Sequence, residues 1–401
     1  MEPAADTGWT GYSLEERDRR WNAVRASAAR EGIDCILVPK GNRLDARYLT
    51  QMPNVGVIMP TDGRPPTVIT DQGRGNDWVE IRPLRQRDRP QWGVPTAEAL
   101  LELGMERARI GVIGLAVGRV TQARAAHGVV TYVAYAEVLK RLPNATVVDA
   151  TDVVGFVRYV KSEAEISCLR RAAAIAEAGI EEMIEVARPG VDQAVLYGRV
   201  TGRLMELGSE HYSQARSDWT AHGWALKTGP LEGEQPRFTG PPIGRRLEHG
   251  TFITNEVSAI WGDMVAQEVQ PMLLAPIPQR WKTLVEVQRE VWEAGLERLS
   301  AGRSFMELVE FVNGFSKVLG VRTTVTLHGR GVGDDGPLIT SRSTNAKLGD
   351  LRLEVGSCWV WKPAAASEDG KAEFQWGGDV VVRANGGERL FRRPHGFVSI
   401  A

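Results

Sequence analysis

Apolar and polar residues follow two different periods in the first part of the chain. Residues 14–32 place apolar side chains at helical spacing and end at a glycine, which predicts an amphipathic helix. Helical stretches recur at residues 94–104 and 132–141. Short runs rich in β-branched residues lie around them and predict strands, at residues 33–39, 55–60, 67–70, 108–114 and 145–150. This alternation predicts a small α/β domain over residues 1–155.

Longer helical patterns dominate from residue 158 onward. They predict two pairs of helices, each pair joined by a glycine turn, at residues 158–187, 193–207, 281–299 and 305–319. Strand-like sequence follows each pair, beginning at residues 251, 325 and 357. The repetition predicts an internal duplication, in which helix pairs pack on one side of a curved antiparallel sheet. The fold class is therefore α+β, with this second domain covering residues 156–401.

Composition and charge exclude several classes of protein. The chain has 401 residues and a formal net charge of −1, which gives no general attraction to nucleic acid or to an anionic membrane. It contains no apolar run of 18 residues and no signal-peptide pattern near its beginning. Its three cysteines are scattered along a long chain, which argues against a disulfide framework and favours a reducing compartment. We expect a cytoplasmic protein with no nucleic-acid or membrane partner.

Several motifs occur in the order that one known family displays. They are Arg-Tyr-Val-Lys-Ser-Glu-Ala-Glu-Ile at 158–166, Arg-Pro-Gly at 188–190, Leu-His-Gly-Arg-Gly-Val-Gly at 327–333 and Asn-Gly at 385–386. Together they resemble the creatinase, aminopeptidase P, prolidase and methionine aminopeptidase family, which has the pita-bread fold. The resemblance spans nearly the whole chain. It implies a homodimer that acts on a small-molecule substrate, with the active site near the subunit interface.

The same resemblance implies that a metal site has been dismantled. The family usually holds two metal ions with two Asp, one His and two Glu, and the matching positions here are Glu256, Gln267, His328, Lys362 and Gly377. An ammonium group has no lone pair for a metal, and an amide replaces a bridging carboxylate poorly. We therefore expect no metal ligands of the family type and no cofactor.

The register of one hairpin leaves two alternatives open. Direct counting places Gln267 at the second Asp position, whereas a turn shorter by one residue places Ala266 there and turns Glu268 toward the pocket. Creatinase, a member of the family that works without metal, has a Glu two positions beyond that site, which Glu268 would match. Its catalytic His position falls near Thr239 here and its other Glu at Lys362, so creatine hydrolysis is not expected.

Four residues form the expected catalytic set. Lys362 would pair with a carboxylate and polarise a carbonyl group, and His328 would act as a general acid or base. The structural alternatives are a solvated lysine at a strand end and a core histidine. The full catalytic set is Glu256, Glu268, His328 and Lys362.

Five further residues are candidates for substrate binding. Arg330 shares a strand face with His328 and would recognise an anion, and the two tryptophans would form part of a cation-binding box or of the core. Asp334 matches the spacing of a proton-abstracting Asp in a metal-dependent dimethylsulfoniopropionate lyase of this fold, although a turn-capping Asp is the commoner role. The candidates are Trp219, His222, Arg330, Asp334 and Trp361.

These residues favour a metal-independent hydrolase or lyase that acts on a C–N or related bond of a small molecule, creatinase-like in fold but not creatinase. Two alternatives stay open. One is a non-catalytic binding protein that has lost its metal ligands. The other is a metal-dependent Xaa-Pro peptidase or lyase with an atypical single site on Glu256, His328 and either Glu268 or Asp335.

Overall fold

The computed structural model describes residues 11–71, 75–84, 92–120, 130–210, 224–232, 245–344 and 350–400. Two compact units divide the chain, and the boundary between them falls after Tyr159. The sequence pattern placed this boundary four residues earlier. No helix among the described residues is long and apolar enough to cross a membrane.

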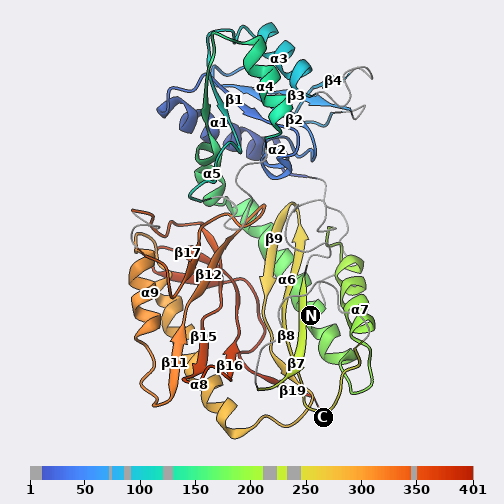
Figure 1. Cartoon of the computed structure of the whole chain (residues 1–401), viewed down its shortest axis with the longest axis vertical. Coiled ribbons are helices and arrows are strands. Elements are labelled where there is room, and N and C mark those ends of the chain that lie inside the picture. The colour runs from blue at the N-terminus through green and yellow to red at the C-terminus, as the bar shows by residue number, and fades with distance from the viewer. Residues whose placement is uncertain are drawn as a thin grey trace. The chain divides into compact units, whose positions relative to one another are not determined.

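The first unit is built on one six-stranded sheet with the order β4-β3-β2-β1-β5-β6 (Figure 1). The central strand β1 pairs antiparallel with β2 and parallel with β5, and β5 pairs parallel with β6. The strands are β1 (Cys35–Val38), β2 (Gly56–Pro60), β3 (Thr67–Thr70), β4 (Ile81–Pro83), β5 (Arg109–Val112) and β6 (Thr146–Asp149). The helices are α1 (Leu14–Arg30), α2 (Arg43–Thr50), α3 (Gly93–Glu102), α4 (Tyr132–Arg141) and α5 (Thr151–Tyr159).

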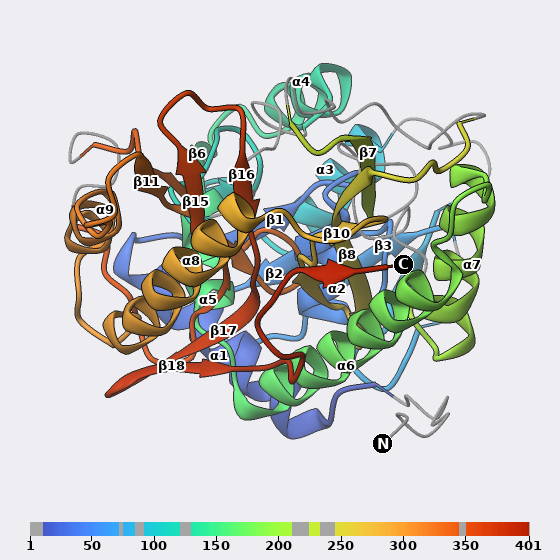
Figure 2. The same cartoon turned by 90° about the horizontal axis from the view of Figure 1, so that it is seen from below.

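In its described residues, the second unit contains two helix pairs and three small sheets (Figures 1 and 2). The first helix pair, α6 (Glu163–Val186) and α7 (Gln193–Glu206), packs on β8 and β9, while α8 (Gln279–Arg298) and α9 (Phe305–Asn313) pack on the later strands. The earlier strands are β7 (Ala225–Pro230), β8 (Thr251–Trp261), β9 (Met264–Glu268) and β10 (Met272–Leu273). The later strands are β11 (Val321–Thr324), β12 (Thr326–Arg330), β13 (Leu338–Thr340), β14 (Cys358–Trp361), β15 (Ala364–Ser367), β16 (Glu373–Gln375), β17 (Gly378–Arg383), β18 (Gly386–Arg389) and β19 (Val398–Ser399).

The predicted two-domain α+β architecture is confirmed, and the differences lie at the ends of elements. The helix expected from Arg158 begins at Glu163, because the Ser162 side chain accepts a hydrogen bond from the Glu165 amide and the Glu165 carboxylate bonds back to the Ser162 amide. The helix expected to reach residue 319 ends at Asn313, where Gly314 caps it. Helices α2 and α5 were not predicted from periodicity.

The duplication gives each helix pair an apolar strand face to cover. On the α6 side, Val257 packs into the core with Ile180 and Leu204. On the α8 side, Trp361 is fully buried, its indole N–H donates to the Trp292 carbonyl at 3.0 Å, and Trp292 returns a bond to the Trp361 carbonyl at 3.2 Å. The helix-facing sides of both halves are therefore closed cores, which leaves the opposite strand faces for a functional site.

Replacing Gly295 by alanine is expected to lower the free energy of unfolding by about 1–3 kcal/mol. A Cβ at this position would lie 2.2 Å from the Trp361 ring, so α8 would have to move away from the sheet. Urea unfolding followed by circular dichroism measures the change. The matched control is Gly198→Ala on the exposed side of α7, where nothing lies within 4 Å of the new Cβ, and where alanine should stabilise the helix by about 0.5–1 kcal/mol. Equal effects of the two variants would contradict the placement of Trp361.

Candidate functional site

The inner face of the second unit is defined by the register of three strands. Pairing of β12, β14 and β17 places His328, Val360 and Asp379 in one row across the sheet. Because alternate residues of a strand face the same side, Arg330 and Lys362 belong to this face as well. The other face carries Leu327 and Trp361, and Trp361 packs against Trp292 and Gly295 of α8.

An ion pair between Lys362 and Glu256 joins the two halves of the unit. The Lys362 ammonium donates to a Glu256 carboxylate oxygen at 2.5 Å. Lys362 is 1% exposed, whereas the Glu256 side chain keeps 18% of its surface in contact with solvent. Glu256 comes from β8 and Lys362 follows β14, so the pair holds a cation at the centre of the inner face.

A second lysine faces the same carboxylate. In the β7–β8 ladder Lys227 lies opposite Thr254, on the strand face that also carries Glu256. Burial lowers the pKa of Lys227, the Glu256 charge opposes that shift, and the Lys362 charge adds to it. Sequence analysis missed Lys227 because it belongs to no motif. Its only signal was its position on the strand that precedes the Gly/Pro-rich segment.

Asp379 is the buried acid of the inner face. Its Oδ2 accepts a hydrogen bond from the Gln267 backbone N–H at 2.6 Å, and the residue has no solvent exposure. Burial raises its pKa to about 7, against the lowering effects of the Arg330 charge, the Gln267 hydrogen bond and the Lys362 charge. Sequence analysis missed Asp379, although it lies two residues beyond Gly377 on the same strand face.

His328, Arg330 and Asp334 form a buried polar cluster. The Arg330 guanidinium donates to Asp334 Oδ1, and His328 Nδ1 lies 3.7 Å from the same oxygen. All three side chains are at most 3% exposed. The structure therefore brings Arg330 and Asp334 next to His328, and Asp334, in the segment between β12 and β13, binds Arg330.

The hairpin register places Gln267, and not Glu268, on the inner face. Ser258 pairs with Gln267 and Val257 pairs with Glu268, so Gln267 shares the face of Glu256 while Glu268 shares the face that packs on α6. Burial raises the pKa of Glu268 well above its usual value, the Glu177 charge on α6 adds to this, and Arg393 opposes it. The expectation that Glu268 acts beside Lys362 is thus corrected.

Of the two expected binding tryptophans, Trp361 is among the described residues and does not face the site. Trp361 belongs to the core against α8, because its strand parity is opposite to that of His328 and Lys362. Trp219, together with His222, lies outside the residues that the structure describes.

The side chains of the inner face do not fit a pair of metal ions of the family type. No three His, Cys, Asp or Glu side chains lie close enough together to hold a metal in the described ranges. The carboxylate of Glu256 is bound by an ammonium group, which cannot act as a ligand. At Gly377 a Cβ would lie 2.0 Å from the Trp361 carbonyl oxygen, so no ligand side chain can occupy that position without moving the backbone.

Comparisons with known proteins agree with this fold. The model of metallopeptidase family M24 matches residues 167–384. An uncharacterized hydrolase/peptidase y4tL of Sinorhizobium fredii is 32% identical over 197 residues, which are 46% of this chain and 49% of the relative. Creatinase of Bacillus sp. is 23% identical over 326 residues, 75% of this chain and 71% of that enzyme. The chain spans about half the length of the first two curated relatives that it matches.

Solved structures give the same fold at low sequence identity. The X-Pro aminopeptidase of Thermotoga maritima has a TM-score of 0.72 and 17% identity, and the Xaa-Pro dipeptidase of Bacillus anthracis has a TM-score of 0.72 and 19% identity. Each match covers 95% of this chain and 99% of the other. The family model covers more than half of the chain, and the resemblance predicted from the motifs is confirmed. The chain therefore belongs to metallopeptidase family M24, a family of hydrolases and peptidases.

Proposed function

We propose that this chain is a metal-independent hydrolase or lyase that cleaves a C–N or related bond of a small molecule. The observation that carries the proposal is the Lys362–Glu256 ion pair, which puts an ammonium group among the positions where the family resemblance expects metal ligands. His328 and Asp379 lie on the same strand face. The set combines a fixed cation with two groups that can exchange protons.

The lysines supply the electrostatic part of the reaction. Lys362 is held by Glu256 and nearly excluded from water, where a positive charge stabilises a developing negative charge more strongly than in solvent. Its role is to polarise the C=O or C=N bond beside the scissile nitrogen. Lys227 adds a second positive charge near Glu256, which keeps the site attractive to a carboxylate-bearing substrate.

Asp379 and His328 supply the proton transfers. The pKa of Asp379 is raised to about 7, so both of its protonation states are populated at neutral pH, as a general base requires. In hydrolysis, Asp379 takes a proton from water, the water oxygen bonds to the carbon, and the π electrons move toward Lys362. Collapse then breaks the C–N bond, and the leaving nitrogen takes a proton from protonated His328.

The test compares chelator-treated protein with protein loaded with Mn, Zn or Co. Both are assayed against small amides, ureas and amidines and against Xaa-Pro dipeptides. The proposal expects turnover of a small C–N substrate that the chelator leaves unchanged. Dipeptide hydrolysis that needs added metal would overturn it and assign the chain to the metal-dependent peptidases of its family.

Replacing His328 by glutamine is expected to lower kcat by on the order of 10²-fold or more, because the leaving group loses its proton donor. His328 is fully buried and its neighbours Arg330 and Asp334 hold each other, so the fold should survive the change. Steady-state kinetics and thermal unfolding measure both effects. The control is His249→Gln, an exposed histidine on a loop, which should leave turnover unchanged. Unchanged turnover in His328→Gln would remove His328 from the mechanism.

A specific observation also favours a second candidate, a non-catalytic binding protein. The charges of the inner face largely neutralise one another, since Lys362 binds Glu256 and Arg330 binds Asp334. Such pairing suits a site that recognises a polar small molecule without reacting with it. Under this alternative, a ligand from the same substrate panel binds in calorimetry but shows no turnover with either protein sample.

A further inference from the structure

A cavity of about 390 Å³ lies wholly within the first unit. Its floor is formed by Leu37 at the end of β1 and Val112 at the end of β5, two strands that run parallel and are paired at these residues. In open α/β sheets, ligands bind at the carboxyl ends of parallel strands where neighbouring connections run in opposite directions. The strand order places such a point between β1 and β5, because β1 continues toward β2 and β5 toward β6.

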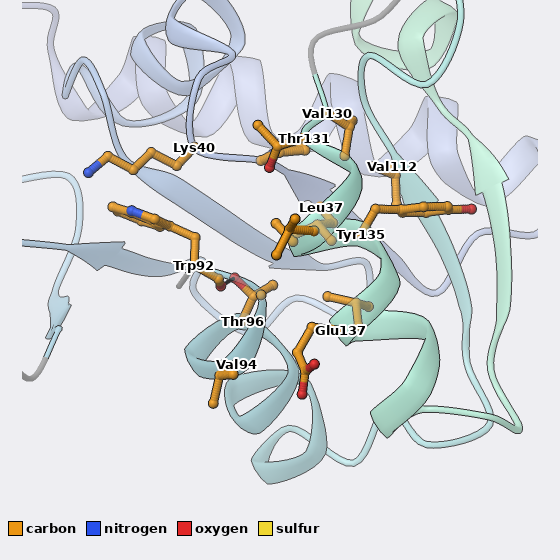
Figure 3. A pocket seen from close by; sticks show the side chains of 15 residues that line it. Leu37, Lys40, Trp92, Val94, Thr96, Val112, Val130, Thr131, Tyr135 and Glu137 are labelled. Carbon is orange, nitrogen blue, oxygen red and sulfur yellow. Dashed lines mark hydrogen bonds between the residues drawn. The ribbon is translucent and has the colours of Figure 1, made fainter. Parts of the chain in front are cut away.

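The walls of the cavity come from the first turns of α3 and α4. Val94 and Thr96 contribute from α3, and Val130, Thr131 and Ala134 contribute from the start of α4 (Figure 3). The lining is mainly apolar, and its volume is within the range of small-ligand sites. The lining residue Val133 and its chain neighbour Tyr132 are 73% and 82% exposed.

One lysine and the first turns of two helices lie at the same cavity. Lys40 lies over the Trp92 ring (Figure 3), with its ammonium 3.8 Å from the ring centroid. The same ammonium lies 3.7 Å from the Asp71 carboxylate. Neither α3 nor α4 has a side-chain cap or an acidic residue in its first turn, so their N-terminal amides keep their partial positive charge. The acidic lining residue Glu137 is bound by Arg141 at 2.7 Å.

We propose that this cavity is a binding site for a small carboxylate with an apolar body, such as an arylacetate or a branched short-chain acid. The carboxylate lies at the first turn of α4, beside the Thr131 hydroxyl and within the field of Lys40. The apolar body lies on Leu37 and Val112 between α3 and α4. This site shares no residue with the proposed catalytic set, and the proposal does not depend on the proposed reaction.

Isothermal titration calorimetry of the full chain with phenylacetate tests the proposal. The expected dissociation constant is about 0.1 mM. Phenylacetamide, which has the same body without the charge, should bind at least about tenfold more weakly, which is 1.4 kcal/mol. Acetate, which has the charge without the body, should show no binding up to about 10 mM.

Two variants locate the site. Ala134→Leu adds a branched side chain to the cavity wall on a residue of good helix propensity and should abolish binding. Lys40→Met should weaken the binding of phenylacetate about tenfold, while the affinity for phenylacetamide should not change. The matched control for the lost charge is Lys140→Met on the exposed end of α4, which should bind like the wild type.

Three outcomes would overturn the proposal. They are equal affinity for phenylacetate and phenylacetamide, wild-type binding by Ala134→Leu, and no heat of binding with any branched or aromatic acid. Concentration-dependent self-association that Ala134→Leu removes, without any acid binding, would assign the surface around Tyr132 and Val133 to a second copy of the chain instead.

Discussion

Replacing Asp379 by asparagine is expected to raise the free energy of unfolding at about pH 8 while abolishing activity. Burial raises the pKa of Asp379 from 3.8 to about 7, so above neutral pH the folded protein holds a buried negative charge that destabilises it. The shift of about three pKa units corresponds to on the order of 4 kcal/mol. Asparagine imitates the protonated acid, and its carbonyl oxygen can still accept the Gln267 N–H.

The pH dependence has a defined sign. Because the pKa is higher in the folded state, the folded state binds more protons than the unfolded state between about pH 4 and pH 7. The stability that Asp379 contributes is fully present below about pH 4 and is lost as the pH rises through about 7. The variant lacks this loss, so the stability difference between the two proteins should be small near pH 4 and largest near pH 8.

Urea unfolding of both proteins across this pH range measures the difference. The control is Asp369→Asn, which replaces a fully exposed carboxylate. Hydrogen bonds from Ser367 and Lys371 lower the pKa of Asp369, so this variant should lower the free energy of unfolding slightly at about pH 8, opposite in sign to Asp379→Asn. A difference for Asp379→Asn that stays constant with pH would show that Asp379 does not titrate near neutrality. It would also remove the reason to name it as the general base. A variant that is more stable but inactive would show that the Asp379 charge lowers the stability of the fold and is needed for activity, as is common for charged groups in active sites.

The sequence predicted the fold well because two independent signals agreed. Helical periodicity identified both helix pairs, and the motifs from Arg158 to the Asn-Gly turn occurred in the family order. The ends of helices were predicted less well, since they depend on single capping residues such as Ser162. The helix that ends at Asn313 illustrates the same limit: its apolar pattern continues, but the chain turns at Gly314.

The site was predicted in part, and the misplacement of Glu268 has one physical cause. Gly262 and Asp263 both have positive φ, 56° and 67°, and form a two-residue turn that pairs Trp261 with Met264. This turn fixes the whole β8–β9 register, and a shift of one residue would exchange Gln267 and Glu268 between the two faces. The sequence left both registers open, because Gly-Asp permits more than one turn length.

Residues outside the motifs could not be identified from sequence at all. Lys227 and Asp379 reach the inner face through strand pairing, with no spacing that distinguishes them from surface charges. Both become important through burial, which lowers the pKa of one and raises the pKa of the other. Tertiary burial is therefore the property that converts these two ordinary charged residues into candidates for chemistry.

Replacing Glu256 by glutamine is expected to lower the free energy of unfolding by about 3 kcal/mol, because it leaves the Lys362 ammonium buried without its carboxylate. Lys362→Met should cost less, about 1–2 kcal/mol, since Glu256 is partly solvated and remains near Lys227. The double variant should lose about 2–3 kcal/mol, which is less than the sum of about 4–5 kcal/mol for the two single variants. Chemical unfolding of the wild type, the two single variants and the double variant measures the coupling energy between Glu256 and Lys362. We expect about 2 kcal/mol.

The exposed pair Arg141–Glu137 on α4 gives the matched control cycle, with an expected coupling of about 0.3–0.5 kcal/mol. If the Glu256–Lys362 coupling falls to that level, the ammonium is not held by the carboxylate in solution. Glu256 would then be available to other ligands, including a metal ion. A strong coupling would instead mean that any metal has to displace a buried ion pair before it reaches Glu256. That cost acts on every divalent cation alike, so a strongly coupled pair favours a site whose cation is Lys362 itself.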